Sequence, residues 1–123
     1  MKRYDPESAP APAEWLSLEE GERIALVERH HHEVEDGFPR SREHAVFHVI
    51  VENQLAIDGQ VEVRAALDRL TAGGLSRHDA IHAIASVLAG YLHALAKSDT
   101  ARFEQAVYDQ GLRQLTARKW RDG

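Results

Sequence analysis

The sequence contains no cysteine, one methionine and few aromatic residues. Without cysteine the chain has no disulfide, no thiolate nucleophile and no Cys-based zinc or iron–sulfur site. No apolar run approaches the roughly 20 residues that a membrane-spanning helix needs, and residues 1–12 lack the apolar core of a signal peptide. We therefore expect a soluble cytoplasmic protein that does not interact with membranes.

Basic residues are fewer than acidic ones. The chain has 15 Lys and Arg against 20 Asp and Glu, a net charge of −5 with neutral histidines. Because binding to a phosphate backbone depends on Lys and Arg, no nucleic-acid partner is expected. Residues 1–60 carry 6 basic and 13 acidic side chains, net −7, and residues 61–123 carry 9 and 7, net +2. Such a split is more often a pair of solvated faces, and the alternative is a homo-oligomer formed by head-to-tail or antiparallel association.

Length and composition predict one all-α domain. A chain of 123 residues, 43% of them hydrophobic, is long enough for one core and too short for two. Pro6, Pro10 and Pro12 stand among small and charged residues, which predicts a flexible lead-in over residues 1–13. Since no segment alternates like a strand, we expect residues 14–123 to form one compact bundle of about five helices with short loops.

Capping residues and glycines mark the predicted helix ends. Ser17 and Glu20 form a capping box for the first helix, and serines also precede the second, fourth and fifth. The helices are predicted over about residues 17–36, 41–57, 61–72, 76–97 and from 98 through 115. In the last of these, one face is expected to be apolar and inward, with Phe103, Val107, Gly111 and Leu115.

The second and fourth predicted helices are the most apolar. Hydrophobic side chains occur almost all round the helix in residues 41–57 and 76–97, as in a helix buried on every side. The fourth helix also has a stripe of small residues, Ala85, Ser86, Ala89 and Gly90, which predicts a close approach by another backbone. These two helices are expected at the centre of the protein.

Each of these two helices carries a pair of histidines, His44 with His48 and His78 with His82. Four residues advance an α-helix by about 400°, so each pair lies on one stripe, one turn apart. At this spacing two imidazoles of one helix can bind the same metal ion. Glu52 continues the first stripe but lies about 12 Å along the axis from His44, which favours a role beside His48.

Topology is expected to bring the two pairs together. Because a single antiparallel helix separates the central helices, they are predicted to run parallel with both pairs at one end. The first helix brings His30, His31 and His32 to that end, with His31 on its apolar face. His93 lies about 16 Å beyond His82 along the fourth helix, outside the cluster. The candidate metal ligands are His44, His48, His78, His82, Glu52 and His31.

The sequence leaves three interpretations of this cluster open. Buried imidazoles need hydrogen-bond partners, and these can bond to one another or to Glu52, Asn53 and Gln54 in a structural network. The second interpretation is a transition-metal site, since nitrogen ligands suit Zn, Ni, Cu or Fe better than Mg or Ca. The third is a site for an organic ligand or for proton transfer.

Two motifs resemble small bacterial helical domains of unknown function. They are H-x2-V-E-N-Q-L from His48 to Leu55 and G-L-S-R-H-D-A-I-H-A-I from Gly74 to Ile84. The resemblance covers residues 44 to about 96, nearly half of the chain. It implies a bacterial helical domain and no established activity, so no catalytic residue is carried over.

The leading functional hypothesis is a helical protein whose His/carboxylate cluster binds a transition metal. If the protein is an enzyme, the simplest chemistry is metal-assisted hydrolysis or hydration with Glu52 as the base. The sequence contains no Gly-rich phosphate loop and no nucleophile elbow. The alternative is a non-catalytic interaction or regulatory module, a homodimer in which buried histidines set the helix register.

Overall fold

The computed structural model describes residues 1–34, 41–57, 59–98 and 102–122, with side chains described except those of 31–34, 41 and 42. These residues form α-helices and no strand, which confirms the all-α class. Within the described ranges the helices are α1 (Pro12–Ser17), α2 (Glu20–Val34), α3 (Ser41–Ala56), α4 (Val61–Ala72), α5 (Arg77–Ala96), α6 (Gln105–Gln114) and α7 (Ala117–Asp122).

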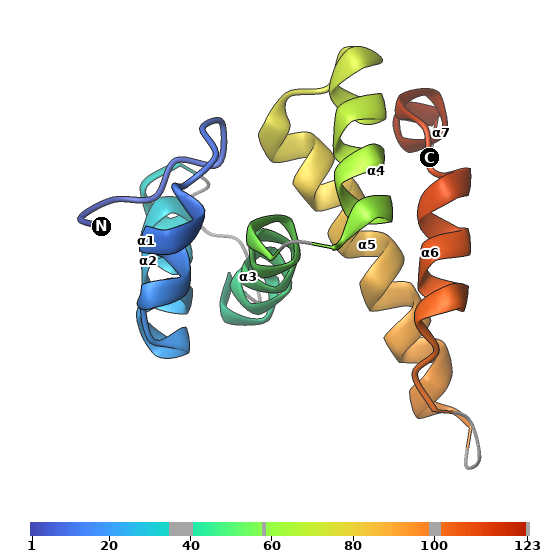
Figure 1. The fold of residues 1–123 in the computed structure, drawn as a ribbon, viewed down its shortest axis with the longest axis horizontal. Helices are drawn as coiled ribbons and strands as arrows, with labels where there is room; N and C mark the ends of the chain where they lie inside the picture. Colours follow the sequence, from blue (N-terminus) through green and yellow to red (C-terminus); the bar gives the residue numbers. More distant parts are fainter. Residues whose placement is uncertain (35–40, 58, 99–101, 123) are drawn as a thin grey trace.

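Helix α3 lies in the middle of the molecule. Figure 1 looks almost along its axis, with α1 and α2 on one side and α4 to α7 on the other. It packs against α1, α2, α4 and α5. Because α4, α5 and α6 run across this view, α3 crosses α5, and the predicted parallel arrangement is wrong (Figure 1). A helix that is apolar all round packs on two sides at once, so its direction is not set by α5 alone.

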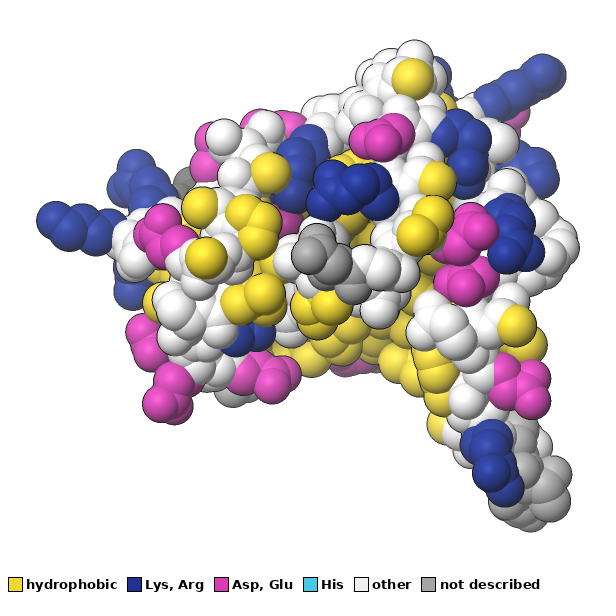
Figure 2. All heavy atoms as spheres, in the orientation of Figure 1, with side chains coloured by type: hydrophobic (Ala, Val, Ile, Leu, Met, Phe, Trp, Pro, Cys, Tyr) yellow, Lys and Arg dark blue, Asp and Glu magenta, His cyan; other side chains and the backbone are white. Residues whose placement is uncertain are grey.

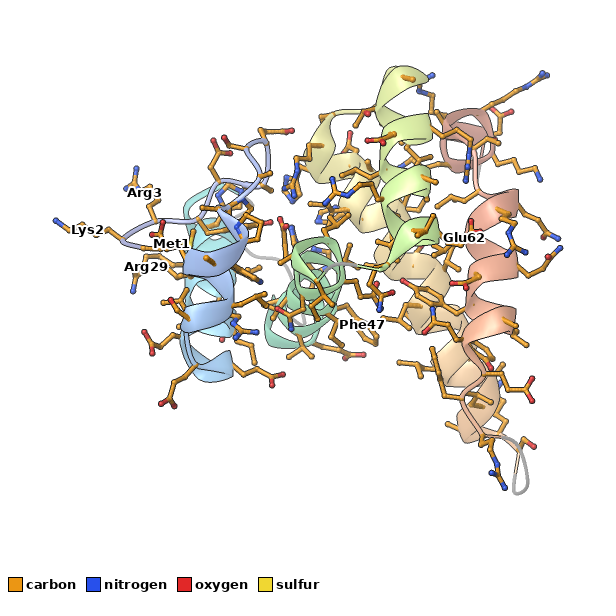
Figure 3. All side chains as sticks on the ribbon, viewed as in Figure 1. Met1, Lys2, Arg3, Arg29, Phe47 and Glu62 are labelled. Atoms are coloured by element: carbon orange, nitrogen blue, oxygen red, sulfur yellow. The ribbon has the colours of Figure 1, made fainter. Side chains whose placement is uncertain are left out.

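Two hydrophobic clusters flank α3, and α3 contributes to both. The N-terminal cluster is Tyr4, Trp15, Ile24, Leu26, Val27, Ala45 and Val49. The C-terminal cluster is Val51, Leu55, Val63, Ala66, Leu67, Leu70, Leu75, Ala80, Ile81, Ala83, Ile84, Ala85, Leu88, Tyr108, Leu112 and Ala117. Figure 3 shows Phe47 on α3, and this side chain packs against the C-terminal cluster. The predicted central position of α3 thus follows from its two apolar faces.

The N-terminal segment, for which the sequence predicts a flexible lead-in, contains one residue of the core and the start of a helix. Tyr4 is 1% exposed and belongs to the N-terminal cluster. Pro12 is in the first turn of α1, where its fixed φ favours a helix start and its missing N–H costs no hydrogen bond. Ser17 is the last residue of α1, and its hydroxyl donates a hydrogen bond to the Glu14 carbonyl at 2.7 Å. The predicted capping box at Ser17 is wrong, and α2 begins at Glu20.

The C-terminal region also departs from the prediction. Residues 99–101 of the expected cap lie outside the described residues, and α6 begins only at Gln105. Its buried side chains are Tyr108 and Leu112, whereas Phe103 and Val107 of the predicted inward face are 44% and 45% exposed. The later start removes Phe103 from the helix, so the apolar spacing counted from it does not define the buried face.

Helix α5 starts where the sequence places it. Gly74 has a φ of +101°, which lets the chain reverse after α4, and the Gly74 and Leu75 N–H groups donate to the last turn of α4. The Ser76 hydroxyl then accepts a hydrogen bond from the Asp79 N–H at 3.1 Å. This confirms Ser76 as the N-cap and sets the orientation of the first two turns of α5, which carry His78 and His82.

By length and composition α5 is apolar enough to cross a membrane, although polar residues interrupt its apolar sequence. The core helix of a soluble protein meets the same criterion. In this structure Ile81, Ile84 and Leu88 of α5 are buried in the C-terminal cluster. Of the most apolar stretch of α5, 33% is buried inside the molecule, so packing in the core accounts for that part of its apolar character.

Candidate metal centre

Five histidine rings from three helices lie together where α2, α3 and α5 meet. Between ring centroids, His44 is 4.4 Å from His82, and His82 is 4.2 Å from His78. His48 is 5.3 Å from His78, and His30 is 5.5 Å from His78. We call these five residues the histidine cluster. The pairs on α3 and α5 thus meet as predicted, although the helices cross.

Three of the rings present nitrogens to a common point. His44, His48 and His82 each offer one nitrogen, and these three atoms lie within 4.8 Å of one another. Tetrahedral ligands at 2.0–2.1 Å from a zinc ion are about 3.4 Å apart. The limit of 4.8 Å is larger than this separation, so binding of an ion would require the rings to move closer together.

The closest contact in the cluster joins α3 to α5. The Nε2 atoms of His44 and His82 are 2.8 Å apart, so one of them donates a hydrogen to the other. A metal ion in place of that hydrogen would need both nitrogens unprotonated and slightly farther apart. The same two atoms can thus form either a hydrogen bond or two ligands of one ion.

Tyr4 connects the cluster to a buried carboxylate. Its hydroxyl donates a hydrogen bond to Oε2 of Glu52 and lies 2.7 Å from Nε2 of His48. All three side chains are almost completely buried. Burial raises the pKa of Tyr4 well above its usual value, and the charge of Glu52 raises it further. The phenol therefore remains a hydrogen-bond donor at neutral pH.

Arg77 provides the counter-charge for this buried carboxylate. It donates to Oε2 and Oε1 of Glu52, both at 2.8 Å, and also to the carbonyl of Pro6 at 2.8 Å. Burial lowers the pKa of Arg77, but its hydrogen bonds to Glu52 and the charge of Glu52 outweigh this effect, and the net shift is upward. Arg77 is thus held as a cation beside the site.

Both oxygens of Glu52 accept hydrogen bonds from Arg77 or Tyr4. The structure therefore places Glu52 behind His48, connected to it through the Tyr4 hydroxyl, and outside the group of three possible ligands. To act as a base, Glu52 would have to give up one of these bonds. A cavity of about 250 Å³ is lined by Glu52 and Arg77, and also by Trp15 and Arg64.

The structure describes the side chains of His30 and His93, but not those of His31 and His32. The side chains of His31, a candidate ligand, and His32 lie outside the described residues. His30, which was expected beside His31, contacts His78 by its ring edge. His93 is exposed near the end of α5, away from the cluster as expected.

Sequence reasoning did not identify Tyr4 or Arg77 as part of the site. Arg77 stands directly before His78 in the second motif and one turn before Ile81. Its place on the helix could therefore be predicted, but its ion pair with Glu52 could not. Tyr4 is an isolated aromatic residue in a Pro-containing segment. Its contacts join residues 44 and 48 positions apart, and no local pattern encodes such a separation.

Comparisons of the chain with protein-family models, curated proteins and solved structures gave no match. The resemblance of the two motifs to bacterial helical domains therefore stays a prediction. Any functional conclusion depends on the chemistry of the histidine cluster itself.

Proposed function

We propose that this protein binds one transition-metal ion, with zinc as the leading candidate, through His44, His48 and His82. The main support is that three imidazole nitrogens from two helices lie within 4.8 Å of one another. An all-nitrogen set of this kind suits Zn, Ni, Cu or Fe better than Mg or Ca. The small separation means that little reorganisation is needed for binding.

The surroundings of the cluster suit a cation. A neutral histidine that ligates a metal commonly donates its other N–H to an oxygen that is itself hydrogen-bonded to a carboxylate or to the backbone. His48 has this arrangement with the Tyr4 hydroxyl and Glu52. The fourth metal position would go to His78, whose ring is 4.2 Å from His82, or to water. The first case makes a closed structural site and the second an exchangeable one.

Metal analysis of protein purified without an affinity tag tests the proposal. We expect about one equivalent of zinc after incubation with zinc and removal of the excess. His82→Ala should lose most of that metal, because one of three ligands is gone. His93→Ala is the matched control, since it removes an exposed histidine of the same helix, and it should bind zinc like wild type.

Thermal unfolding gives an independent measure. A bound metal stabilises the folded state by RT ln(1 + [L]/Kd), or about 4 kcal/mol at a thousandfold excess over Kd. A chelator should therefore lower the melting temperature of zinc-loaded wild type and of His93→Ala, and leave that of His82→Ala unchanged. Wild type that binds no zinc, or that does not respond to chelator, would overturn the proposal.

A second candidate function is the non-catalytic homodimeric module with structural histidines. The hydrogen bond between His44 and His82 supports it, because the two rings satisfy each other without a metal. Exposed apolar side chains at Val61, Phe103 and Val107 offer a surface for a second copy. Figure 2 shows hydrophobic atoms along the projecting end of α5 and α6. Light scattering of wild type and Val107→Asp would detect such a dimer.

A further inference from the structure

The Tyr4 hydroxyl has one hydrogen, and both Oε2 of Glu52 and Nε2 of His48 lie within hydrogen-bond distance of it. Glu52, which accepts two N–H bonds from Arg77, has only lone pairs to offer, so Tyr4 donates its hydrogen to Glu52. The phenol oxygen must then accept a hydrogen from Nε2 of His48, 2.7 Å away. His48 thus carries a proton on Nε2.

This hydrogen bonding determines which atom of His48 can ligate a metal. A neutral imidazole has one N–H and one nitrogen with a free lone pair, and the hydrogen bond of one nitrogen fixes the state of the other. With Nε2 protonated, the lone pair of His48 is on Nδ1. His44 and His82, by contrast, approach each other with their Nε2 atoms.

We propose that Tyr4 is a positioning residue for the metal centre, which fixes the tautomer of His48 so that Nδ1 is the ligand atom. This inference rests on the proposed zinc binding. Arg77 and Glu52 act through Tyr4: the guanidinium holds the carboxylate by two hydrogen bonds, and the carboxylate orients the phenol. The phenol in turn makes Nδ1 of His48 more basic by accepting the proton on the opposite nitrogen.

The position of Tyr4 in the chain gives this arrangement a regulatory consequence. Two further bonds hold the same segment: Arg77 donates to the Pro6 carbonyl, and the His78 N–H donates to Glu7 at 3.1 Å. Lys2 and Arg3, by contrast, point away from the molecule (Figure 3). Residues 4–7 thus form a strap across α3 and the start of α5. If docking of this strap raises the affinity for metal by some factor, linkage requires that bound metal raises the equilibrium constant for docking by the same factor.

A pair of tyrosine variants isolates the role of the phenol. Tyr4→Phe removes the bridging hydroxyl and keeps the ring. Tyr108→Phe is the matched control, because Tyr108 is equally buried and donates one hydrogen bond, to Gln54 at 2.8 Å, away from the cluster. Zinc titrations by calorimetry should show a 10- to 100-fold weaker Kd for Tyr4→Phe and a Kd close to that of wild type for Tyr108→Phe.

Nitrogen-15 spectroscopy of the metal-free protein reads the tautomer directly. We expect His48 of wild type as the Nε2–H form, and a mixture of tautomers in Tyr4→Phe. Backbone hydrogen exchange supplies the linkage measurement: zinc should slow exchange over residues 4–7 in wild type and Tyr108→Phe, and much less in Tyr4→Phe.

The outcomes separate the two proposals. If wild type binds no zinc, the proposed function fails and the positioning role fails with it. If wild type binds zinc but Tyr4→Phe binds it equally well, or if His48 carries its proton on Nδ1, only the role of Tyr4 is overturned. A similar loss of affinity in Tyr108→Phe would also overturn it, since the effect would then follow from general loss of stability.

Discussion

The guanidinium of Arg77 donates two hydrogen bonds to Glu52, one to each carboxylate oxygen. The Glu52 side chain is 1% exposed and that of Arg77 13% exposed. In such a place each charge has lost most of its hydration and depends on the other. The pair therefore joins α3 to the first turn of α5 beside the histidine cluster.

Replacing Glu52 should be strongly destabilising. Glu52→Gln leaves Arg77 as a buried cation without a counter-charge, and we expect a loss of about 3–5 kcal/mol in the free energy of unfolding. Urea titrations measure this loss. The same variant should leave the helix content of the folded protein unchanged, because α3 does not depend on this side chain for its own hydrogen bonds.

Glu62→Gln is the control for that change. Glu62 of α4 pairs with Arg113 of α6 at 3.0 Å, and both side chains are partly exposed, 27% and 53%. Solvent screens such a pair, so its loss should cost no more than about 1 kcal/mol. Equal losses for the two variants would show that burial does not set the strength of the Arg77–Glu52 pair.

Much of the fold could be predicted because its signals are local. The glycines after α4 and the Ser76 cap define the turn before α5, and the four-residue spacing of the histidines places each pair on one helix stripe. These features depend on residues within one or two turns of each other. They do not depend on how the helices pack.

The remaining features depend on contacts between distant segments. Ser17 has the residue type of an N-cap, but Pro12 starts a helix that ends at Ser17, and the two local signals compete. Tyr4 belongs to the core only because α3 presents His48 and Glu52 to it. The crossing of α3 and α5 likewise results from packing on both sides of α3, which the period of the sequence does not encode.

Tyr108 should make the stability fall in alkaline solution. Burial raises its pKa to about 12, with a further contribution from Asp109, whereas an unfolded tyrosine loses its proton near pH 10. Between these values the folded state holds a proton that the unfolded state has lost. Stability is therefore full below about pH 10 and should fall by about 1.4 kcal/mol per pH unit above it.

Comparison with Tyr108→Phe isolates this effect from the titration of lysines and of Tyr4. Urea titrations of both proteins between pH 9 and pH 11 give the slope of unfolding free energy with pH. The variant should have a shallower fall above pH 10. Identical slopes would mean that Tyr108 ionises as readily in the folded protein as in the unfolded chain.

The Ser76 cap should contribute measurably to stability. Ser76→Ala removes the oxygen that accepts the Asp79 N–H, and N-cap replacements of this kind cost about 0.5–2 kcal/mol. Ser86→Ala is the control within the same helix, because the Ser86 hydroxyl only donates to the Ala83 carbonyl one turn back. It should change the free energy of unfolding by less than about 0.5 kcal/mol. A Ser76→Ala protein with the same free energy of unfolding as wild type would show that the cap is not needed for α5.

Two glycines should respond in opposite ways to alanine. A Cβ at Gly90 of α5 would meet nothing within 4 Å, so Gly90→Ala should stabilise the protein by about 0.5–1 kcal/mol through helix propensity. A Cβ at Gly73 would lie 2.8 Å from the Cβ of Ala117, the buried first residue of α7, and Gly73→Ala should destabilise the protein by about 1–3 kcal/mol. Thermal unfolding measures both.

The stripe of small residues around Gly90 predicts the close approach of another backbone. A second copy bound there would be displaced by the new methyl group of Gly90→Ala. A Gly90→Ala protein that is less stable, and whose loss grows with protein concentration, would therefore contradict the free surface seen at Gly90 and support the dimer.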